Sequence, residues 1–324
     1  MNPRVLVGVL ACNHKAKTLA CLTSLAASDY RDFDVFLLDN GSGEEIAEAA
    51  RKFSFVTADT RPKNIGASAG RNLILRYFLN RGDWSYLLFL DNDMRVASET
   101  LGTVVRKARE LQSERRPLGA LGAHIIYRNS PEKYWSAGGA LMDWENSWFR
   151  EQGQGGIRGR DFSEPRRLEA IPTAFLFATR EAVEKTGDFA EDYFFYFEDA
   201  DWSWRMAAAG FELWSVPEAV AAHDVSSSLG KCSPGFYFLR TRNRLWFFQR
   251  FSPKSSGEIR RKIFKSVLWE SAYPEFRAGH FKEALAVIRG FWAGLRQPKK
   301  LQRVPSASSM TGEVRKLIPS GPAL

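Results

Sequence analysis

The chain has 324 residues, of which 44% are hydrophobic and 26% are charged. This length predicts one large domain or one domain with an appendage, and the hydrophobic share excludes a disordered chain. The net charge of +9 lies in residues 251–324, which hold fourteen Lys or Arg and five Asp or Glu, whereas residues 1–250 hold 32 of each sign. No apolar stretch approaches the roughly 20 residues that cross a bilayer.

Strands and helices alternate in the first part of the chain. The pattern predicts strands over 4–11, 35–38, 53–57 and 86–91, and helices over 16–28, 44–52 and from 64–72 to about residue 80. Such alternation is typical of βαβ units, and therefore of a mostly parallel sheet with helices on its faces. Since the first strand begins at residue 4, we expect no signal peptide. Three cysteines without metal-type spacing favour reduced thiols in a cytosol.

The strand over 86–91 is a continuous apolar run, which indicates burial on both faces. It ends at two carboxylates, Asp91 and Asp93. Open α/β sheets bind ligands at the carboxyl ends of their strands, and a buried charge needs a partner. Mg²⁺ or Mn²⁺ is a natural partner for hard oxygen ligands. The alternative is that Asp-Asn-Asp caps the next helix or makes a turn.

The middle of the chain has a different pattern. Strands are predicted over 119–127, 170–177 and 211–216, a strand and turn over 133–142, and a helix over 180–186 that Gly187 ends. Residues 150–167 are rich in Gly and Arg without periodicity, so they form either a mobile loop near a substrate or a plain surface loop.

A second acidic cluster comprises Glu198, Asp199 and Asp201 at the start of a helix that ends at Gly210. An N-cap role explains one of these carboxylates better than all three. A helix N-terminus also keeps a carboxylate ionised, as a general base requires. His223 follows; a lone His in a bare sequence is more often structural than a ligand.

Aromatic and basic helices make up the C-terminal part. Helical patterns begin at Gly235 and recur over 257–270 and 280–295, and the tail from Gln297 has the composition of a disordered segment. We therefore predict a main domain over 1–230, a helical extension over 231–296 and a disordered basic tail over 297–324.

These motifs together resemble the inverting nucleotide-sugar glycosyltransferases of glycosyltransferase family two, which have the GT-A fold. Within the family, the chain looks most like the rhamnosyltransferase-like enzymes of bacterial surface-polysaccharide assembly. The resemblance covers residues 4–250, and its order and spacing are specific although each motif alone is weak. It is carried by Ala-Cys-Asn-His at 11–14, Leu-Leu-Asp-Asn-Gly-Ser at 37–42, Asn-Ile-Gly-Ala-Ser-Ala-Gly-Arg-Asn at 64–72, Phe-Leu-Asp-Asn-Asp at 89–93, Trp-Ser-Ala-Gly-Gly at 135–139, the acidic-aromatic stretch 187–202, His223 and Arg-Asn-Arg at 242–244.

Two positions depart from the family's pattern. Ala11-Cys12-Asn13 stands where Thr-Tyr-Asn is common, which bears on how the base is held. Phe189-Ala190-Glu191 lacks the Asp of the usual Gly-Phe-Asp-Glu, which bears on packing or acceptor contacts.

The resemblance implies a role for each matched residue. Asp199 would be the general base, with Asp201 as the alternative, and Asp91, Asp93 and His223 would hold Mn²⁺ or Mg²⁺. A carboxylate at Asp39 suits the N3–H of uracil or thymine. The implied nucleotide contacts are Asn13, Asp39, Asn64, Gly66, Arg71, Asp91 and Asn92. The implied diphosphate or acceptor contacts are Trp135, Gly138, Glu198, Trp202, Arg242 and Arg244.

The implied reaction is a metal-dependent single displacement in the cytoplasm. It would move a sugar from a UDP- or dTDP-sugar to a hydroxyl of a glycan or lipid-linked acceptor. A sugar nucleotidyltransferase would need a glycine-rich phosphate loop after the first strand, and a dehydrogenase would need G-x-G-x-x-G there; residues 11–14 contain no glycine.

The non-catalytic alternative is a basic, membrane-associated scaffold or a degenerate transferase. The charge of residues 251–324 supports it, and nothing resembles a nucleic-acid-binding motif. The C-terminal helices would either lie peripherally on the anionic cytoplasmic face of the inner membrane or pack on the core as ordinary amphipathic helices.

Overall fold

The computed structural model describes residues 2–43, 45–225 and 233–298. Its strands are β1 (Val5–Ala11), β2 (Phe33–Asn40), β3 (Val56–Arg61), β4 (Tyr86–Asp91), β5 (Met94–Val96), β6 (Leu118–Tyr127), β7 (Ser130–Ala137), β8 (Ala140–Asp143), β9 (Trp148–Glu151), β10 (Arg167–Leu168), β11 (Phe175–Thr179) and β12 (Glu212–His223). Among the described residues, ten strands form one sheet with the main order β10-β12-β6-β11-β4-β1-β2-β3. The β8–β9 hairpin is a separate two-stranded sheet.

The sheet is mixed and mostly parallel on its N-terminal side. Strand β1 pairs in parallel with β2 and β4, and β2 pairs in parallel with β3. Strand β11 is antiparallel to both β4 and β6, whereas β6 and β12 are parallel. These pairings confirm the predicted α/β fold class.

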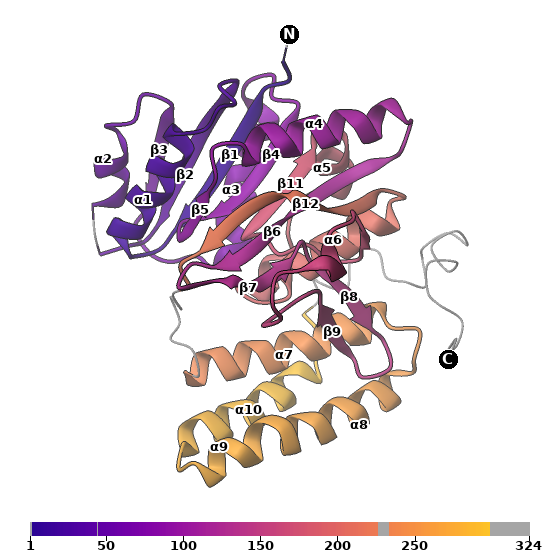
Figure 1. Cartoon of the computed structure of the whole chain (residues 1–324). Coiled ribbons are helices and arrows are strands. Elements are labelled where there is room, and N and C mark those ends of the chain that lie inside the picture. Colours follow the sequence, from indigo (N-terminus) through magenta and orange to yellow (C-terminus); the bar gives the residue numbers. More distant parts are fainter. Residues whose placement is uncertain (1, 44, 226–232, 299–324) are drawn as a thin grey trace.

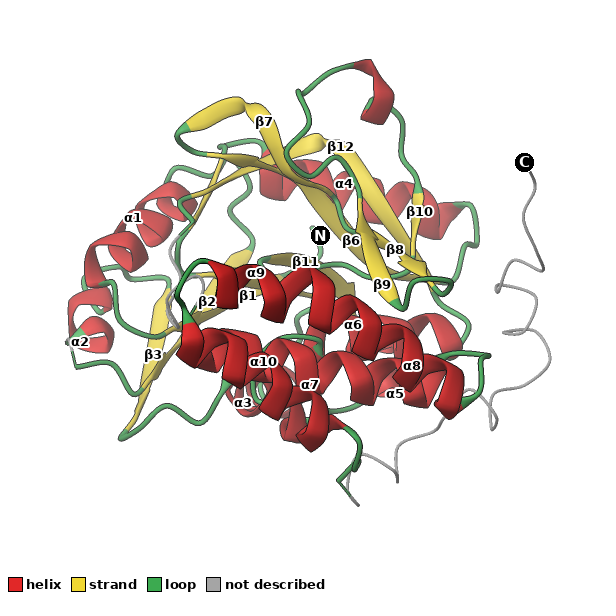
Figure 2. Cartoon of the chain, turned by 90° about the horizontal axis from the view of Figure 1, so that it is seen from below, coloured by secondary structure: helices red, strands yellow, loops and turns green. Residues whose placement is uncertain are grey.

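Helices cover both faces of the sheet and its lower edge in Figure 1. They are α1 (Lys15–Ala26), α2 (Ile46–Ala50), α3 (Ala67–Asn80), α4 (Thr100–Ser113), α5 (Arg180–Thr186), α6 (Glu198–Ala208), α7 (Pro234–Phe251), α8 (Ser256–Val267), α9 (Tyr273–Arg277) and α10 (Phe281–Gly294), and a π-helical turn (Leu268–Ala272) joins α8 to α9. Figure 2, seen from below, shows α7 to α10 lying across the ends of the strands.

Alternation along β1 divides its side chains between two cores. Val5, Val7 and Val9 pack in the cluster that contains side chains of α1 and α4, whereas Leu6 packs on the opposite face with side chains of α3. Because both faces are covered, strands such as β4 are apolar throughout, as the sequence indicated.

A third core joins the C-terminal helices to the rest of the chain. It combines buried side chains of α7, α8 and α10 with the β8–β9 hairpin and residues 193–204. The helical C-terminal extension is therefore confirmed as helical, and it shares this core with the preceding residues. The division at residue 230 stays a prediction, and the predicted disorder of the tail falls on residues 299–324, outside the described part.

Three elements differ from the sequence-based expectation. Helix α4 was not predicted, although its buried Leu101, Val104, Val105, Ala108 and Leu111 have helical spacing. The third strand begins at Val56 instead of residue 53, because residues 50–56 make turns. Strand β12 continues past a register shift between Val216 and Val220 and reaches His223.

Among the described residues, no helix is both long and apolar enough to cross a membrane.

Candidate active site

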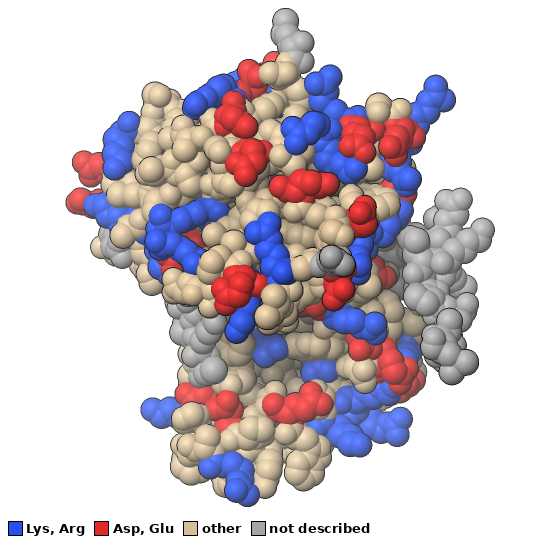
Figure 3. Space-filling model, in the orientation of Figure 1, with Lys and Arg blue, Asp and Glu red and all other residues tan. Residues whose placement is uncertain are grey.

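The parallel strands bring their carboxyl ends to one edge of the sheet. Ala11 of β1 lies level with Asp39 of β2, and Leu10 lies level with Asp91 of β4. This edge faces α7 in Figure 1, and Figure 3 shows the surface hollowed between the sheet and the C-terminal helices. Ligands bind at such an edge in open α/β sheets.

Three predicted nucleotide contacts meet at the end of β2. The Asp39 side chain is buried, and its Oδ1 accepts a hydrogen bond from the Ser42 amide at 3.0 Å. The Asn13 amide donates to Ser42 Oγ at 2.7 Å, and Asn64 Nδ2 donates to Cys12 Sγ at 3.4 Å. Burial and the Asp39 charge raise the pKa of the Cys12 thiol, so this residue presents a neutral surface beside the carboxylate.

Gly66 lies where α3 meets the segment before α6. Its φ is +89°, and a Cβ built on it would lie 2.5 Å from the Phe194 ring. The amide of Ala67 donates to the Phe194 carbonyl at 2.7 Å. A glycine is required here by both the backbone angle and the close approach, so Gly66 docks one element of the site on another.

Arg71 of α3 is buried and links the start of α6 to the end of β4. It donates to Glu198 Oε1 at 2.6 Å and to Asp91 Oδ1 at 3.2 Å. Burial raises the pKa of Glu198 and the neighbouring Asp199 raises it further, whereas Arg71 lowers it. The guanidinium of Arg71 and the carboxylate of Glu198 thus form a buried ion pair, and their expected contacts, to the nucleotide for Arg71 and to the diphosphate or acceptor for Glu198, stay predictions.

Asp93 and His223 form a second buried pair. Asp93 Oδ1 lies 3.1 Å from His223 Nε2, although 130 residues separate them. Strand β5 brings them together, because Met94 lies opposite His223 in the antiparallel β5–β12 pair. His223 Nδ1 is buried without a hydrogen-bond partner among the described residues.

The expected three-residue metal set is not assembled. In the described part of the chain, no three side chains of His, Cys, Asp or Glu are grouped as a metal site, because Asp91 turns to Arg71. Asn92 also turns away, since its Nδ2 donates to Thr18 Oγ1 at 2.8 Å and to the Asn13 carbonyl.

The Asp93–His223 pair alone fits a divalent ion. Adjacent ligands of an octahedral ion with bonds of 2.0–2.1 Å lie about 3 Å apart, which matches the 3.1 Å separation. One carboxylate and one imidazole are ligands that suit Mn²⁺. Other ligands would come from outside the chain.

Asp199 lies in the first turn of α6 and is half-buried. Burial raises the pKa of its carboxyl, and Arg71 counteracts that effect. The preceding backbone is unusual: Phe194, Tyr196 and Phe197 all have positive φ, at 65°, 70° and 70°. Such angles are costly for non-glycine residues, so another group must hold this segment in place.

Asn243 of α7 holds the segment. Its fully buried Nδ2 donates to the carbonyls of Tyr193, Phe195 and Tyr196 at 2.9, 2.8 and 2.8 Å. The resemblance included Asn243 in Arg-Asn-Arg, but we assigned roles only to the two arginines. Asn243 thus supports the backbone that presents Asp199.

Asp201 is not an alternative base, and that prediction is wrong. Its side chain is fully buried and accepts hydrogen bonds from Arg205, Arg250 and the Tyr193 hydroxyl. Three donors around one carboxylate fasten α6 to α7 and leave no route to an acceptor.

Three of the expected diphosphate or acceptor contacts are structural instead. Trp202 is fully buried and stacks on Phe189 with ring centroids 4.8 Å apart. Arg242 donates to the Asp192 and Tyr193 carbonyls. The sequence could not show that these side chains point into the fold, since one helix face cannot be distinguished from another by motif alone.

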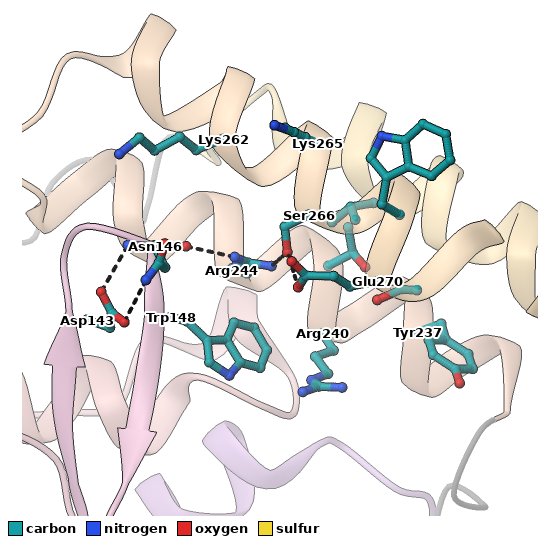
Figure 4. Close-up of a pocket in the computed structure, with 14 residues that line it drawn as sticks. Asp143, Asn146, Trp148, Tyr237, Arg240, Arg244, Lys262, Lys265, Ser266 and Glu270 are labelled. Carbon is teal, nitrogen blue, oxygen red and sulfur yellow. Dashed lines mark hydrogen bonds between the residues drawn. The ribbon is translucent and has the colours of Figure 1, made fainter. Parts of the chain in front are cut away.

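Arg244 is the third structural contact. It donates to the Asn146 and Ser147 carbonyls and to Ser266 Oγ, as Figure 4 shows in part. It thereby fastens the β8–β9 turn to α7 and α8 beside a cavity of about 790 Å³.

Two further residues lie close to the site. Trp135 packs edge-on against the His223 ring, with centroids 4.7 Å apart, so it borders the Asp93–His223 pair. Gly138 has a φ of +99°, and a Cβ built on it would lie 2.6 Å from Ser215 Cβ. Gly138 therefore permits a close approach between β7 and β12.

Glu151 was not identified from the sequence. It ends β9, accepts a hydrogen bond from Ser136 Oγ at 2.6 Å, and has its pKa raised to about 7 by burial and by the Asp199 charge. Its neighbours in the chain are Gly- and Arg-rich without periodicity, and no motif marks it. Like Glu198 and Asp91, it is a carboxylate close to Asp199 with a raised pKa.

The sequence was compared with protein families and with curated proteins. Residues 6–162 match the family model described as glycosyl transferase family 2. No curated protein sequence matches the chain.

Solved structures resemble the chain at low sequence identity. GalNAc-T7 with UDP, GalNAc and Mn²⁺ matches with a TM-score of 0.59 and 15% identity over 85% of this chain, which spans 51% of that protein. Residues 1–349 of TarS from S. aureus with UDP-GlcNAc match with a TM-score of 0.56 and 15% identity, over 93% of this chain and 83% of that one. The mannosyltransferase PcManGT from Pyrobaculum calidifontis with GDP-Man and Mn²⁺ matches with a TM-score of 0.55 and 13% identity, over 91% and 88%. At these identities the likeness concerns the fold: the chain has the GT-A fold, and its residues 6–162 resemble glycosyl transferase family 2.

Proposed function

We propose that the protein is a metal-dependent inverting glycosyltransferase. It would move a sugar from a UDP- or dTDP-sugar to a hydroxyl of a glycan or lipid-linked acceptor. One observation carries this proposal: Asp39 and Asp91 end strands at one edge of the sheet, the Asp93–His223 pair lies two residues after Asp91, and the Asp199 carboxylate is close enough to Asp91 for the two charges to interact. The family match and neighbours crystallised with UDP-GlcNAc or GDP-Man support a nucleotide-sugar donor. The rhamnosyltransferase-like branch stays a prediction.

The base of the donor nucleotide would bind beside Asp39, at the end of β2. One carboxylate oxygen of Asp39 accepts from Ser42, and a carboxylate has capacity for further donors, such as the N3–H of uracil or thymine. Asn13 and Asn64 border the same strand end through Ser42 and Cys12. This pattern favours a pyrimidine base.

Asp93 and His223 would hold Mn²⁺ or Mg²⁺. When bound, the ion neutralises charge on the leaving diphosphate. Magnesium usually binds through one or two carboxylates together with substrate phosphates, so two protein ligands are sufficient. Asp91 would act indirectly, since it accepts from Arg71 and so helps to fix Glu198 at the start of α6.

Asp199 would act as the general base. It takes the proton of the acceptor hydroxyl while that oxygen attacks the anomeric carbon, and the bond from this carbon to the diphosphate oxygen breaks on the opposite face. The configuration therefore inverts. Its raised pKa brings the carboxylate closer to neutral pH, where a base is most effective.

Substitution of Asp199 by Asn tests the assignment. A positioned base contributes about 10²–10⁴-fold, so transfer should fall by that factor while nucleotide affinity stays unchanged. Glu151→Gln is the matched comparison, because it neutralises the neighbouring carboxylate and leaves Asp199 intact. Loss of transfer in Glu151→Gln, with transfer retained in Asp199→Asn, would make Glu151 the base.

A further inference from the structure

Exposed hydrophobic side chains gather on the C-terminal helices. Among the described residues, eight large hydrophobic side chains are strongly exposed, and seven of them lie between residues 264 and 292. We call these seven the aromatic face: Phe264, Trp269, Tyr273, Phe276, Phe281, Leu285 and Trp292. Trp292 and Phe281 are 62% and 61% exposed. A concentration of this kind marks an interaction surface.

Several side chains of the aromatic face are neighbours, and Trp269 also borders the cavity beside α7. Phe281, Leu285 and Trp292 recur along one side of α10. The Phe276 and Phe281 rings are 5.3 Å apart across the α9–α10 turn, and the Trp269 and Tyr273 rings are 5.5 Å apart. In Figure 1, α8, α9 and α10 form the end of the molecule farthest from the sheet.

The exposed charges on the same helices are mostly positive. Between residues 256 and 296 the exposed cations outnumber the exposed carboxylates seven to one. The cations are Arg260, Arg261, Lys265, Arg277, Lys282, Arg289 and Arg296, and the carboxylate is Glu270. Lys282 and Arg289 lie seven residues apart on α10, beside its apolar stripe, and Arg296 follows just after the helix ends.

We propose that the aromatic face docks on an anionic phospholipid surface, with α10 lying in the membrane–water interface. Trp, Tyr and Phe favour that interface, where an apolar stripe enters the headgroup region. Flanking Lys and Arg add electrostatic attraction to anionic lipids. The face thus combines the two components of peripheral membrane binding.

Charge also decides against a second copy of the chain as the occupant. A twofold contact would place this basic surface against its own image, and like charges across an interface oppose association. An anionic surface instead neutralises the cations.

Docking would set the orientation of the candidate site. The carboxyl edge of the sheet faces α7, on the same side of the sheet as α8 to α10 (Figures 1 and 2), so docking would turn this edge toward the membrane. Membrane docking does not depend on the proposed transferase activity. The suggestion that docking gives access to a lipid-linked acceptor does rest on that activity.

Vesicle flotation of the full chain tests the proposal. Phosphatidylcholine vesicles with phosphatidylglycerol should bind the protein, and phosphatidylcholine alone should bind it weakly. Added salt should weaken binding. Trp269 and Trp292 should give a blue-shifted fluorescence on binding, since they would leave water.

Two sets of variants separate the contributions. Phe281→Ser with Trp292→Ser removes the most exposed rings of α10 and should reduce binding at least about tenfold. Lys282→Gln with Arg289→Gln should reduce it about 30-fold. Ile157→Ser is the matched control, because Ile157 is 74% exposed but lies in the 150–167 region; its binding should be unchanged.

Three results would overturn the proposal. The first is no binding to anionic vesicles by the folded protein, and the second is equal binding by Ile157→Ser and the Phe281/Trp292 variant. The third is a dimer that the Phe281/Trp292 variant abolishes, which would assign the face to a second copy. Nucleotide binding by the same preparations distinguishes these failures from failure of the proposed function.

Discussion

Asn243→Ala should separate transfer from donor binding. The substitution removes the Nδ2 group that donates to the carbonyls of Tyr193, Phe195 and Tyr196. The three residues with positive φ in this segment cost about 1–3 kcal/mol each. Without Asn243, Arg242 and the Ala67 amide still hold the carbonyls of Tyr193 and Phe194, but those of Phe195 and Tyr196 lose this donor, so the start of α6 should relax.

The size of the effect follows from the contacts. The Tyr193 carbonyl keeps other donors, so two carbonyls, those of Phe195 and Tyr196, are left unpaired at about 1–3 kcal/mol each, which gives about 2–6 kcal/mol in total. The melting temperature should fall by about 5–15 °C. A displacement of about 1 Å at a catalytic group can cost about 10²-fold, so turnover should fall to that extent while the nucleotide dissociation constant stays the same.

Gln249→Ala is the matched control. Gln249 lies on the same helix, and its amide donates to the Leu245 and Gly294 carbonyls, away from the segment. Turnover, thermal melting and hydrogen exchange of residues 193–200 would be measured for both variants. The account would be refuted by normal turnover in Asn243→Ala, or by equal losses of turnover in the two variants.

Three further predictions concern the surroundings of the site. Asp201→Asn should lower the free energy of unfolding by about 3–5 kcal/mol, because Arg205 and Arg250 lose their buried carboxylate; an unchanged urea midpoint would contradict this. Glu151→Gln should raise the melting temperature above pH 7 and leave it unchanged near pH 4. The folded-state pKa of Glu151, about 7, exceeds the ordinary Glu value of 4.5, so the wild-type protein loses stability as pH rises from 4.5 to 7; an equal shift at both pH values would disprove the reasoning. Gly66→Ala should weaken nucleotide binding, since the new Cβ meets Phe194; calorimetry showing wild-type affinity would exclude this role.

Local patterns were sufficient for the sheet and for its strand-end residues. Apolar runs that end in polar residues placed Asp39 and Asp91 correctly, because neighbouring parallel strands end at the same edge. The pairing of Asp93 with His223 came from the resemblance, since nothing local connects residues so far apart. Helix α4 was missed even though its stripe was present.

The sequence could not predict which of the candidate side chains are buried and bonded to other parts of the fold. Arg71, Asp201 and Trp202 stand in motifs that suggest ligand contacts, yet each is buried among partners distant in the chain. Burial of a charge is decided by which elements pack over it. Glu151 is the opposite case: no sequence motif contains it, yet burial and the Asp199 charge raise the pKa of its carboxyl in the folded protein.

Calorimetric titration with UDP, dTDP and GDP, each with and without Mn²⁺, tests the central claim most directly. Wild type and Asp93→Ala would be compared. The account predicts metal-dependent binding of a pyrimidine diphosphate that Asp93→Ala abolishes. Absence of binding by the folded wild type, or equal affinity without metal and in Asp93→Ala, would contradict it.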